Sequence, residues 1–195
     1  TTKNNGGVPE NFRNYFVIQF SHPIAYMFNP EGKAIKLTEK VKRGCIVGFK
    51  TSHRNEQVTA RVASSFVSYD HAMLNLKELQ QAGETLENIA AHGQKQWNEV
   101  LGRVEVNDEN IDHKRTFYSC LYRCLLFPRM LWEQDVNGNI IHYSPYNGKV
   151  LEGYLFTDTG YWDTFRSLFP LLNLIYPSRN EKMQAGLVNA YRESG

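Results

Sequence analysis

The sequence predicts an α+β protein with more than one domain, in which a β-rich first part is followed by helices. Short aromatic and β-branched runs follow one another up to about residue 69, with no helical pattern between them. From Ser68-Tyr69-Asp70 onward, apolar residues recur at helical spacing. An aperiodic stretch from 129 to about 158 then separates strongly apolar helical segments. Strands followed by helices are typical of α+β proteins or of separate domains.

The β-rich part contains three runs of strand length. Two of them are short, at 15–20 and 44–49, and the third covers 57–67. Apolar and polar residues alternate from Val58 to Val62, as expected for a sheet that is buried on one face. Because no helix separates these runs, we expect an antiparallel sheet that forms part of a β-sandwich.

Two helices are expected after the strands. Asp70 is the expected N-cap of the first, which continues until Gly83 interrupts the pattern. The second runs from about Glu84 to Leu101 and has one apolar and one polar face. A half-exposed helix at this position is typical of a connector between a sheet and further helices.

A third helix is capped by Asn107 or Asp108 and stops before Pro128. Its second half is apolar on nearly every side, which predicts burial among other helices. Residues 129 to about 158 then form turns, because Asn137-Gly138 is a hairpin signal and 144–148 reads as a second turn. Long loops between helices are often functional, but turns favour Asp and Asn, so the favoured interpretation of the carboxylates here is a turn or surface role. These carboxylates are Glu133, Asp135, Glu152 and Asp158.

The last part of the chain returns to helices. Pro170 lies inside an apolar pattern and removes a helical hydrogen bond, so the helix is expected to kink or restart there. The run Ser178-Arg179-Asn180-Glu181 has the pattern of a capping box for the final helix. Strongly apolar helices alternating with a more amphipathic one predict stacked antiparallel helical hairpins with inner and outer layers.

The net charge, the length of the apolar runs and the number of cysteines exclude several classes of function. A formal charge of +2 is too small to indicate nucleic acid or an anionic membrane as a partner. No apolar run reaches membrane-spanning length, and no signal peptide is visible in this segment. Three cysteines make no disulfide framework, and we expect Cys120 and Cys124 to be small buried hydrophobes. Without an initiator Met, the chain is expected to be a fragment of a longer protein.

The stretch 153–166 is the strongest candidate for a binding site. Two glycines and small hydroxyl residues lead into a Tyr-Trp-Asp cluster that opens an apolar helix. Asp163 is expected in the first helical turn, where the dipole favours a carboxylate, and a neighbouring ring suits a ligand such as a sugar. The alternative is core packing at i, i+3, i+4, i+7 spacing. The residues with that spacing are Trp162, Phe165, Arg166 and Phe169.

Two long stretches also resemble a known family. Residues 115–123 with Pro128, and 160–172 with the run Trp-Asp-Thr-Phe-Arg and its Pro-Leu-Leu tail, resemble glycoside hydrolase family 92, the exo-acting α-mannosidases. The run Ser65-Phe66-Val67-Ser68, followed by Ala72 and Asn75-Leu76, resembles the end of the N-terminal β-sandwich of that family. The resemblance extends from about residue 15 to 195 in consistent order.

The resemblance implies a division of the chain and a mechanism. Residues 1–69 would complete a β-sandwich, 70–105 would be linker helices, and 106–195 would begin an (α/α)6 barrel. The family hydrolyses α-mannosides of oligosaccharides or N-glycans with inversion, here expected at α-1,2 linkages, and requires calcium (Ca2+). Asp163 is expected to contact mannose hydroxyls beside Trp162, and we expect Arg166 to brace Asp163 by an i, i+3 pair.

The resemblance also limits what this segment can do. Inverting glycosidases need an acid and a base about 6.5–9.5 Å apart. In the family these carboxylates and most calcium ligands lie beyond the position of residue 195, so no catalytic or metal-binding residue is assigned and the segment alone is expected to be inactive. Family members are usually exported, which predicts a periplasmic or secreted protein. The alternatives are another (α/α)6-barrel glycosidase or a non-catalytic carbohydrate-binding protein.

Overall fold

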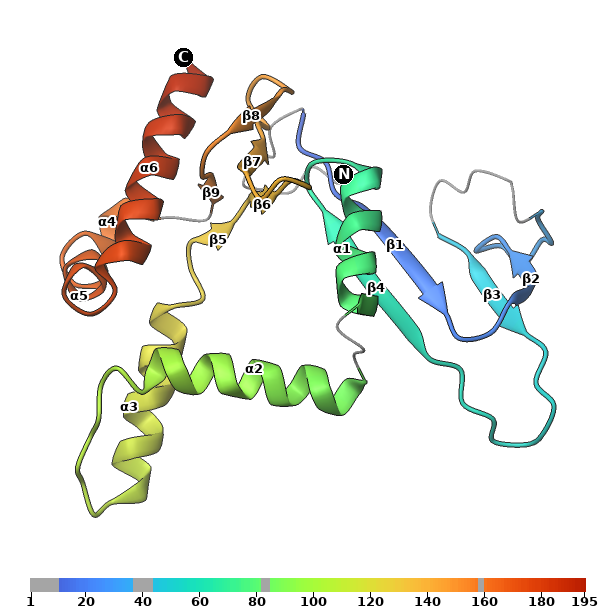
Figure 1. The fold of residues 1–195 in the computed structure, drawn as a ribbon, viewed down its shortest axis with the longest axis horizontal. Coiled ribbons are helices and arrows are strands. Elements are labelled where there is room, and N and C mark those ends of the chain that lie inside the picture. Colours follow the sequence, from blue (N-terminus) through green and yellow to red (C-terminus); the bar gives the residue numbers. More distant parts are fainter. Residues whose placement is uncertain (1–10, 37–43, 82–84, 158–159) are drawn as a thin grey trace.

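The computed structural model describes residues 11–36, 44–81, 85–157 and 160–195. Within these ranges the chain forms small antiparallel sheets and six helices, with strands dominating before α1 and helices dominating after it (Figure 1). A second group of strands is inserted between α3 and α4. None of the helices in these ranges is both long and apolar enough to cross a membrane.

The first strands pair in an antiparallel manner, as the sequence predicts, but they form two separate two-stranded sheets where one sheet was expected. Strand β1 (Tyr15–Phe20) pairs with β4 (Ala60–Ser65), and β2 (Ile24–Phe28) pairs with β3 (Ile46–Phe49). Helix α1 packs against β1 and β4. Strand β2 was not expected, because only its own five residues lie between Pro23 and the turn that begins at Asn29.

The covered face of β4 is not the one that the alternation predicts. Ser65 is 2% exposed and Ala63 is half-buried, whereas Val62 is 58% exposed. Phe16 and Ile18 of β1 share the open face, since Ile18 pairs with Val62. Helix α1 covers the opposite face, so the local pattern identifies two faces but does not show which one a distant element covers.

Helices α1 and α2 begin one or two residues away from the predicted positions. The Ser68 hydroxyl caps α1 (Tyr69–Gln81) by accepting from the His71 amide at 3.1 Å. Asp70 is therefore not the N-cap but lies in the first turn of α1. At this position its negative charge interacts favourably with the positive end of the helix dipole. The Thr85 hydroxyl caps α2 (Leu86–Leu101).

Helix α3 (Ile111–Cys124) starts after Asn110, whose side chain accepts from the Asp112 amide, so the predicted caps at 107 or 108 lie too early. The prediction that its second half is buried on all sides is wrong for the described chain. Leu121 is 4% exposed, but Tyr122 is 39% exposed. Cys120 is exposed and Cys124 is only half-buried, because the neighbouring helices cover one side of α3.

The aperiodic stretch folds into short strands around the two predicted turns. Strand β5 (Arg129–Met130) pairs with β9 (Phe156–Thr157). Strands β6 (Trp132–Gln134), β7 (Ile140–Tyr143) and β8 (Val150–Glu152) form one antiparallel sheet. The hairpin prediction is confirmed.

The turn between β6 and β7 depends on Asp135 and Gly138. The Asp135 carboxylate accepts from the amides of Asn137 and Asn139, and Gly138 has a φ of 81° that favours glycine. The predicted second turn, at 144–148, joins β7 to β8. Both turns are encoded locally, which explains why sequence patterns find them.

The last helices are α4 (Tyr161–Thr164), α5 (Leu168–Ile175) and α6 (Pro177–Ser194). Pro170 lies in the first turn of α5, so the helix restarts there, as predicted. The predicted capping box is wrong, because Pro177 occupies the first turn of α6 and the following Ser178 is already helical. A proline fixes φ at the helical value and lacks the amide that an N-terminal turn leaves unpaired.

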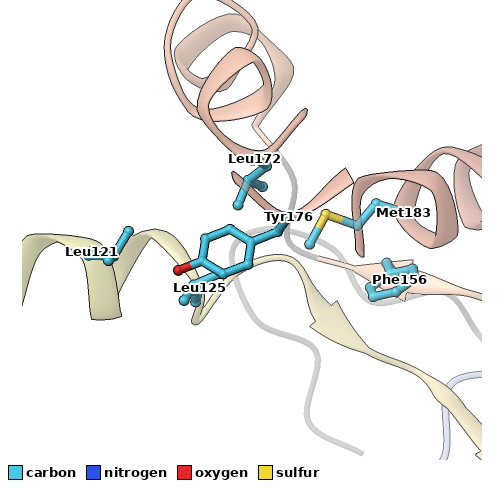
Figure 2. Packing of buried hydrophobic residues seen from close by; sticks show 6 residues of the cluster. All are labelled: Leu121, Leu125, Phe156, Leu172, Tyr176 and Met183. Atoms are coloured by element: carbon cyan, nitrogen blue, oxygen red, sulfur yellow. The ribbon is translucent and has the colours of Figure 1, made fainter. Parts of the chain in front are cut away.

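The hydrophobic core lies where α3, α5, α6 and β9 meet, and Tyr176 stands at its centre (Figure 2). Its ring is 3% exposed, and its hydroxyl donates to the carbonyl of Val100 at 3.0 Å. The cluster contains Leu121, Leu125, Phe156, Leu172, Tyr176 and Met183.

Three residues along α6 contact the inserted strands or the segment between β8 and β9. A Cβ on Gly186 would lie 2.7 Å from the Phe156 ring. The Asn189 amide donates to the carbonyl of Tyr154 at 3.0 Å, and Glu193 lies 2.9 Å from Nε2 of the fully buried His142. The sheet of β6–β8 is thereby held beside the last helix.

Candidate functional site

The candidate site lies at the start of α4, where the chain leaves β9. Gly160 is the N-cap, and Asp163 lies in the first turn of the helix, as predicted. The Thr164 hydroxyl donates to the Gly160 carbonyl at 2.8 Å, which closes this single turn. No hydrogen bond or ion pair within the described ranges engages the exposed Asp163 carboxylate, so its oxygens are free to accept from a ligand.

Exposed rings flank this carboxylate. Trp162 is 76% exposed and Phe165 is 54% exposed, so core packing does not account for either ring in the described chain. Tyr161 stacks on Phe169 with ring centroids 6.2 Å apart, and burial raises the pKa of its phenol. The start of α4 therefore carries an exposed carboxylate and, at neighbouring positions in the chain, aromatic rings that solvent can reach.

Arg166 does not make the pair with Asp163 that the sequence predicts. The Arg166 guanidinium lies over the Trp162 ring at 5.7 Å and over the Phe165 ring at 5.1 Å. Helix α4 has only four residues, so i, i+3 geometry is not maintained to position 166. The rings offer the planar cation a cation–π contact instead.

The other candidate carboxylates have roles elsewhere. Glu133 accepts from Ser65 and Phe66, and hydrogen bonds within the turn engage Asp135. The bond from the Asn139 side chain, followed by the backbone bonds, lowers the pKa of Asp135. Glu152 lies exposed on β8, and Asp158 lies outside the described residues.

The described side chains do not fit a metal centre of their own. Across the ranges that the structure covers, no group of three or more His, Cys, Asp or Glu side chains could hold a metal ion. Calcium needs six to eight oxygen ligands, and among the described residues of the candidate stretch Asp163 offers one exposed carboxylate at the start of α4.

Sequence patterns did not indicate a basic pocket of about 220 Å³ between α2, β6 and α6. The pocket is lined by Arg103, Arg179 and Lys182 together with Trp132 and Tyr176, among others. Two of the cations are held by backbone carbonyls, since Arg103 donates to Ile175 and Arg179 donates to Leu125. Burial lowers the pKa of Arg179. Because the lining residues come from segments far apart in the chain, no local pattern could have revealed the pocket.

Comparisons with known proteins identify the family of the chain. The sequence profile of the glycosyl hydrolase family 92 catalytic domain matches residues 71–195. A family GH92 inverting mannosidase from Bacteroides thetaiotaomicron has a similar structure, with a TM-score of 0.84 and 41% identity over 98% of this chain. A GH92 α-mannosidase from the same organism follows, with a TM-score of 0.73 and 26% identity over 94% of the chain.

The chain spans 26% of the first of these structures and 25% of the second. We found no match among curated protein sequences. The family profile covers well over half of the chain, including α3, the inserted strands and the candidate site. The chain belongs to glycosyl hydrolase family 92.

Proposed function

We propose that the whole protein is an inverting exo-α-mannosidase that removes mannose from oligosaccharides or N-glycans, and that it acts on α-1,2 linkages. Family membership supports the reaction class, and the similarity to an inverting mannosidase at 41% identity supports the stereochemistry. The observation in this chain that carries the proposal is the exposed Asp163 carboxylate, which has no partner among the described residues and is followed and preceded in the chain by exposed rings.

Asp163 is the proposed contact to the mannose hydroxyls. A carboxylate only accepts hydrogen bonds, and bonds from hydroxyls to a charged oxygen are shorter and stronger than neutral ones. Trp162 would cover the apolar face of the sugar, while Arg166 stabilises the ring by lying over it. These three residues bind and orient the substrate, and none of them moves a proton in the proposed reaction.

The general acid and base are proposed to lie outside these 195 residues. Inversion requires two carboxyl groups about 6.5–9.5 Å apart on opposite faces of the sugar. Glu133 and Asp135 are occupied by hydrogen bonds of the fold, which makes both unsuitable for proton transfer. Asp163 would therefore hold the sugar against groups that other parts of the protein supply.

The proposal extends to the architecture of the whole protein. Residues 1–69 would belong to a β-sandwich, 70–105 to linker helices and 106–195 to the start of an (α/α)6 barrel. The open apolar face of β1 and β4 supports a second sheet packed over it, because such faces are rarely left exposed. The open side of α3 supports further helices in the same way.

We also propose that the whole enzyme requires calcium and is periplasmic or secreted. The support is the family resemblance of the sequence. Calcium would supply positive charge near the sugar, but the described side chains contain no cluster that could hold it. Its ligands would accordingly come from outside the described residues.

The test uses the whole protein with aryl α-mannosides, aryl α-glucosides and α-1,2-mannobiose. We expect hydrolysis of the mannosides only, first release of β-mannose by NMR, and loss of activity with a chelator that added calcium restores. Preference for glucosides would indicate a different glycosidase. Binding of mannosides without turnover would indicate a carbohydrate-binding protein, and activity that resists chelation would refute the calcium requirement.

A further inference from the structure

Three segments that are distant in the sequence meet at the Glu133 carboxylate. Its Oε1 accepts from the Ser65 hydroxyl at 3.0 Å and from the Phe66 amide at 2.7 Å. Its Oε2 lies 3.4 Å from the side-chain nitrogen of Asn75. Figure 1 shows β6, which carries Glu133, beside the end of β4 and helix α1. We call this set of bonds the Glu133 clamp.

The clamp is part of a satisfied polar network. Ser65 is 2% exposed, and its hydroxyl donates to Glu133 while it accepts from the Val67 amide at 2.9 Å. Asn75 also donates to the carbonyl of Ser64 at 2.9 Å, which fixes the orientation of its amide group. Without Glu133, the Ser65 and Phe66 donors would lose their acceptor in a mostly water-excluded corner, which is costly.

Neighbouring contacts join the same two regions. His71 of α1 lies 3.1 Å from the carbonyl of Gln134, the residue after Glu133. On the far side of the sheet, a Cβ on Gly148 would lie 3.4 Å from the Asn11 side chain. Polar contacts of Glu133 and Gln134 therefore join β6 to the end of β4 and to α1.

The strand that holds Glu133 is coupled to the candidate site. Trp132 packs edge-on against Tyr154, with ring centroids 5.0 Å apart. The Leu131 amide donates to the Leu155 carbonyl at 2.9 Å. Strand β9 then ends at Thr157, three positions before Gly160. These contacts join β6 to the segment that leads into β9, so a shift of β6 would be transmitted to β9.

We propose that Glu133 is a positioning residue, which couples the N-terminal strands to the loop that presents Asp163. It acts as a carboxylate, because a glutamine would place its NH₂ group against either the Phe66 amide or the Asn75 amide. This role rests on the proposed function for its effect on turnover. Its structural part, the coupling itself, can be measured without any activity.

The test uses the whole enzyme with Glu133→Gln, Glu133→Ala and Ser65→Ala. Glu152→Gln is the matched control, since Glu152 is an exposed carboxylate on the same sheet. Hydrogen exchange should become at least about tenfold faster at the Phe66 amide and in the segment around Gly160 for each clamp variant. Unchanged exchange at Phe66, or faster exchange there without a change around Gly160, would overturn the proposal.

A double-mutant cycle on kcat/KM distinguishes a role of Glu133 in positioning Asp163 from a general loss of enzyme stability. Glu133→Gln should lower kcat/KM for an aryl α-mannoside about tenfold in the natural protein, but less than about twofold in an Asp163→Asn background. An equal loss in both backgrounds would overturn the coupling to Asp163. If the natural protein does not hydrolyse α-mannosides, the proposed function fails, while the exchange measurements still decide whether the clamp exists. If Glu133→Ala does not fold, Glu133→Gln and Ser65→Ala provide the same comparison.

Discussion

The dipeptides Trp132-Glu133 and Trp162-Asp163 look alike in the sequence but lie in opposite environments. The first lies in a strand, where Trp132 is half-buried and Glu133 accepts hydrogen bonds from Ser65 and Phe66. The second lies at a loop-to-helix junction, where Trp162 is 76% exposed and the carboxylate has no described partner. An acid whose oxygens are occupied holds the fold together, whereas one whose oxygens are open is available to a ligand.

The largest expected effect is at Asp163. In the whole enzyme, Asp163→Asn should lower kcat/KM for an aryl α-mannoside at least about 100-fold, or about 2.7 kcal/mol, because the amide places a donor where sugar hydroxyls donate. The thermal midpoint should not change, since the side chain is exposed and has no partner among the described residues. A variant with full activity, or one that loses stability, would contradict the distinction between the two acids.

Glu133 should show the reverse behaviour. Glu133→Ala should destabilise the protein by about 1–3 kcal/mol in urea unfolding, because it leaves the Ser65 and Phe66 donors unsatisfied. Glu152→Ala should leave the midpoint unchanged. Equal midpoints for the two variants would mean that the clamp adds nothing to stability.

The two tryptophans sharpen the same comparison. Trp162→Ala should weaken binding of a mannoside about tenfold while it changes the free energy of unfolding by less than about 0.5 kcal/mol. Trp132→Ala should cost at least about 2 kcal/mol of stability, because its ring packs against Tyr154. Calorimetry and urea unfolding on both variants measure these effects, and similar stability losses would remove the contrast.

Asp135 is partly exposed to solvent but has hydrogen-bond partners within its turn, so it is intermediate between Glu133 and Asp163. The expected effect is smaller and depends on pH. Its hydrogen bonds to Asn139 and Asn137 lower its pKa in the folded state. A carboxylate with a lowered pKa adds stability above its unfolded pKa of about 3.9 and loses that contribution as the pH falls through the folded pKa. Asp135→Asn should therefore reduce the change in turn protection between pH 7 and pH 3, measured by amide exchange at Asn139. An unchanged pH dependence would show that this carboxylate does not stabilise the turn.

Local chemistry explains which features the sequence could predict. Asn137-Gly138 and Pro170 act through their own backbone preferences, so the hairpin and the restarted helix were found. The exposed face at Val62 and the exposed Cys120 depend on which distant elements cover them, which no local pattern contains. Asp163 was predicted as a site residue from its neighbours in the chain, whereas the partners of Glu133 lie 58 to 68 residues away.

The attachment of α6 to the inserted strands sets an order for folding during synthesis. Glu193 is translated 51 residues after His142, and Asn189 is translated 35 residues after Tyr154. At a translation rate of about 5–20 residues per second, Glu193 is synthesised several seconds after β7. Until then the His142 side chain lacks its contact with Glu193, so the inserted sheet gains its full stability only after the last turn of α6 leaves the ribosome.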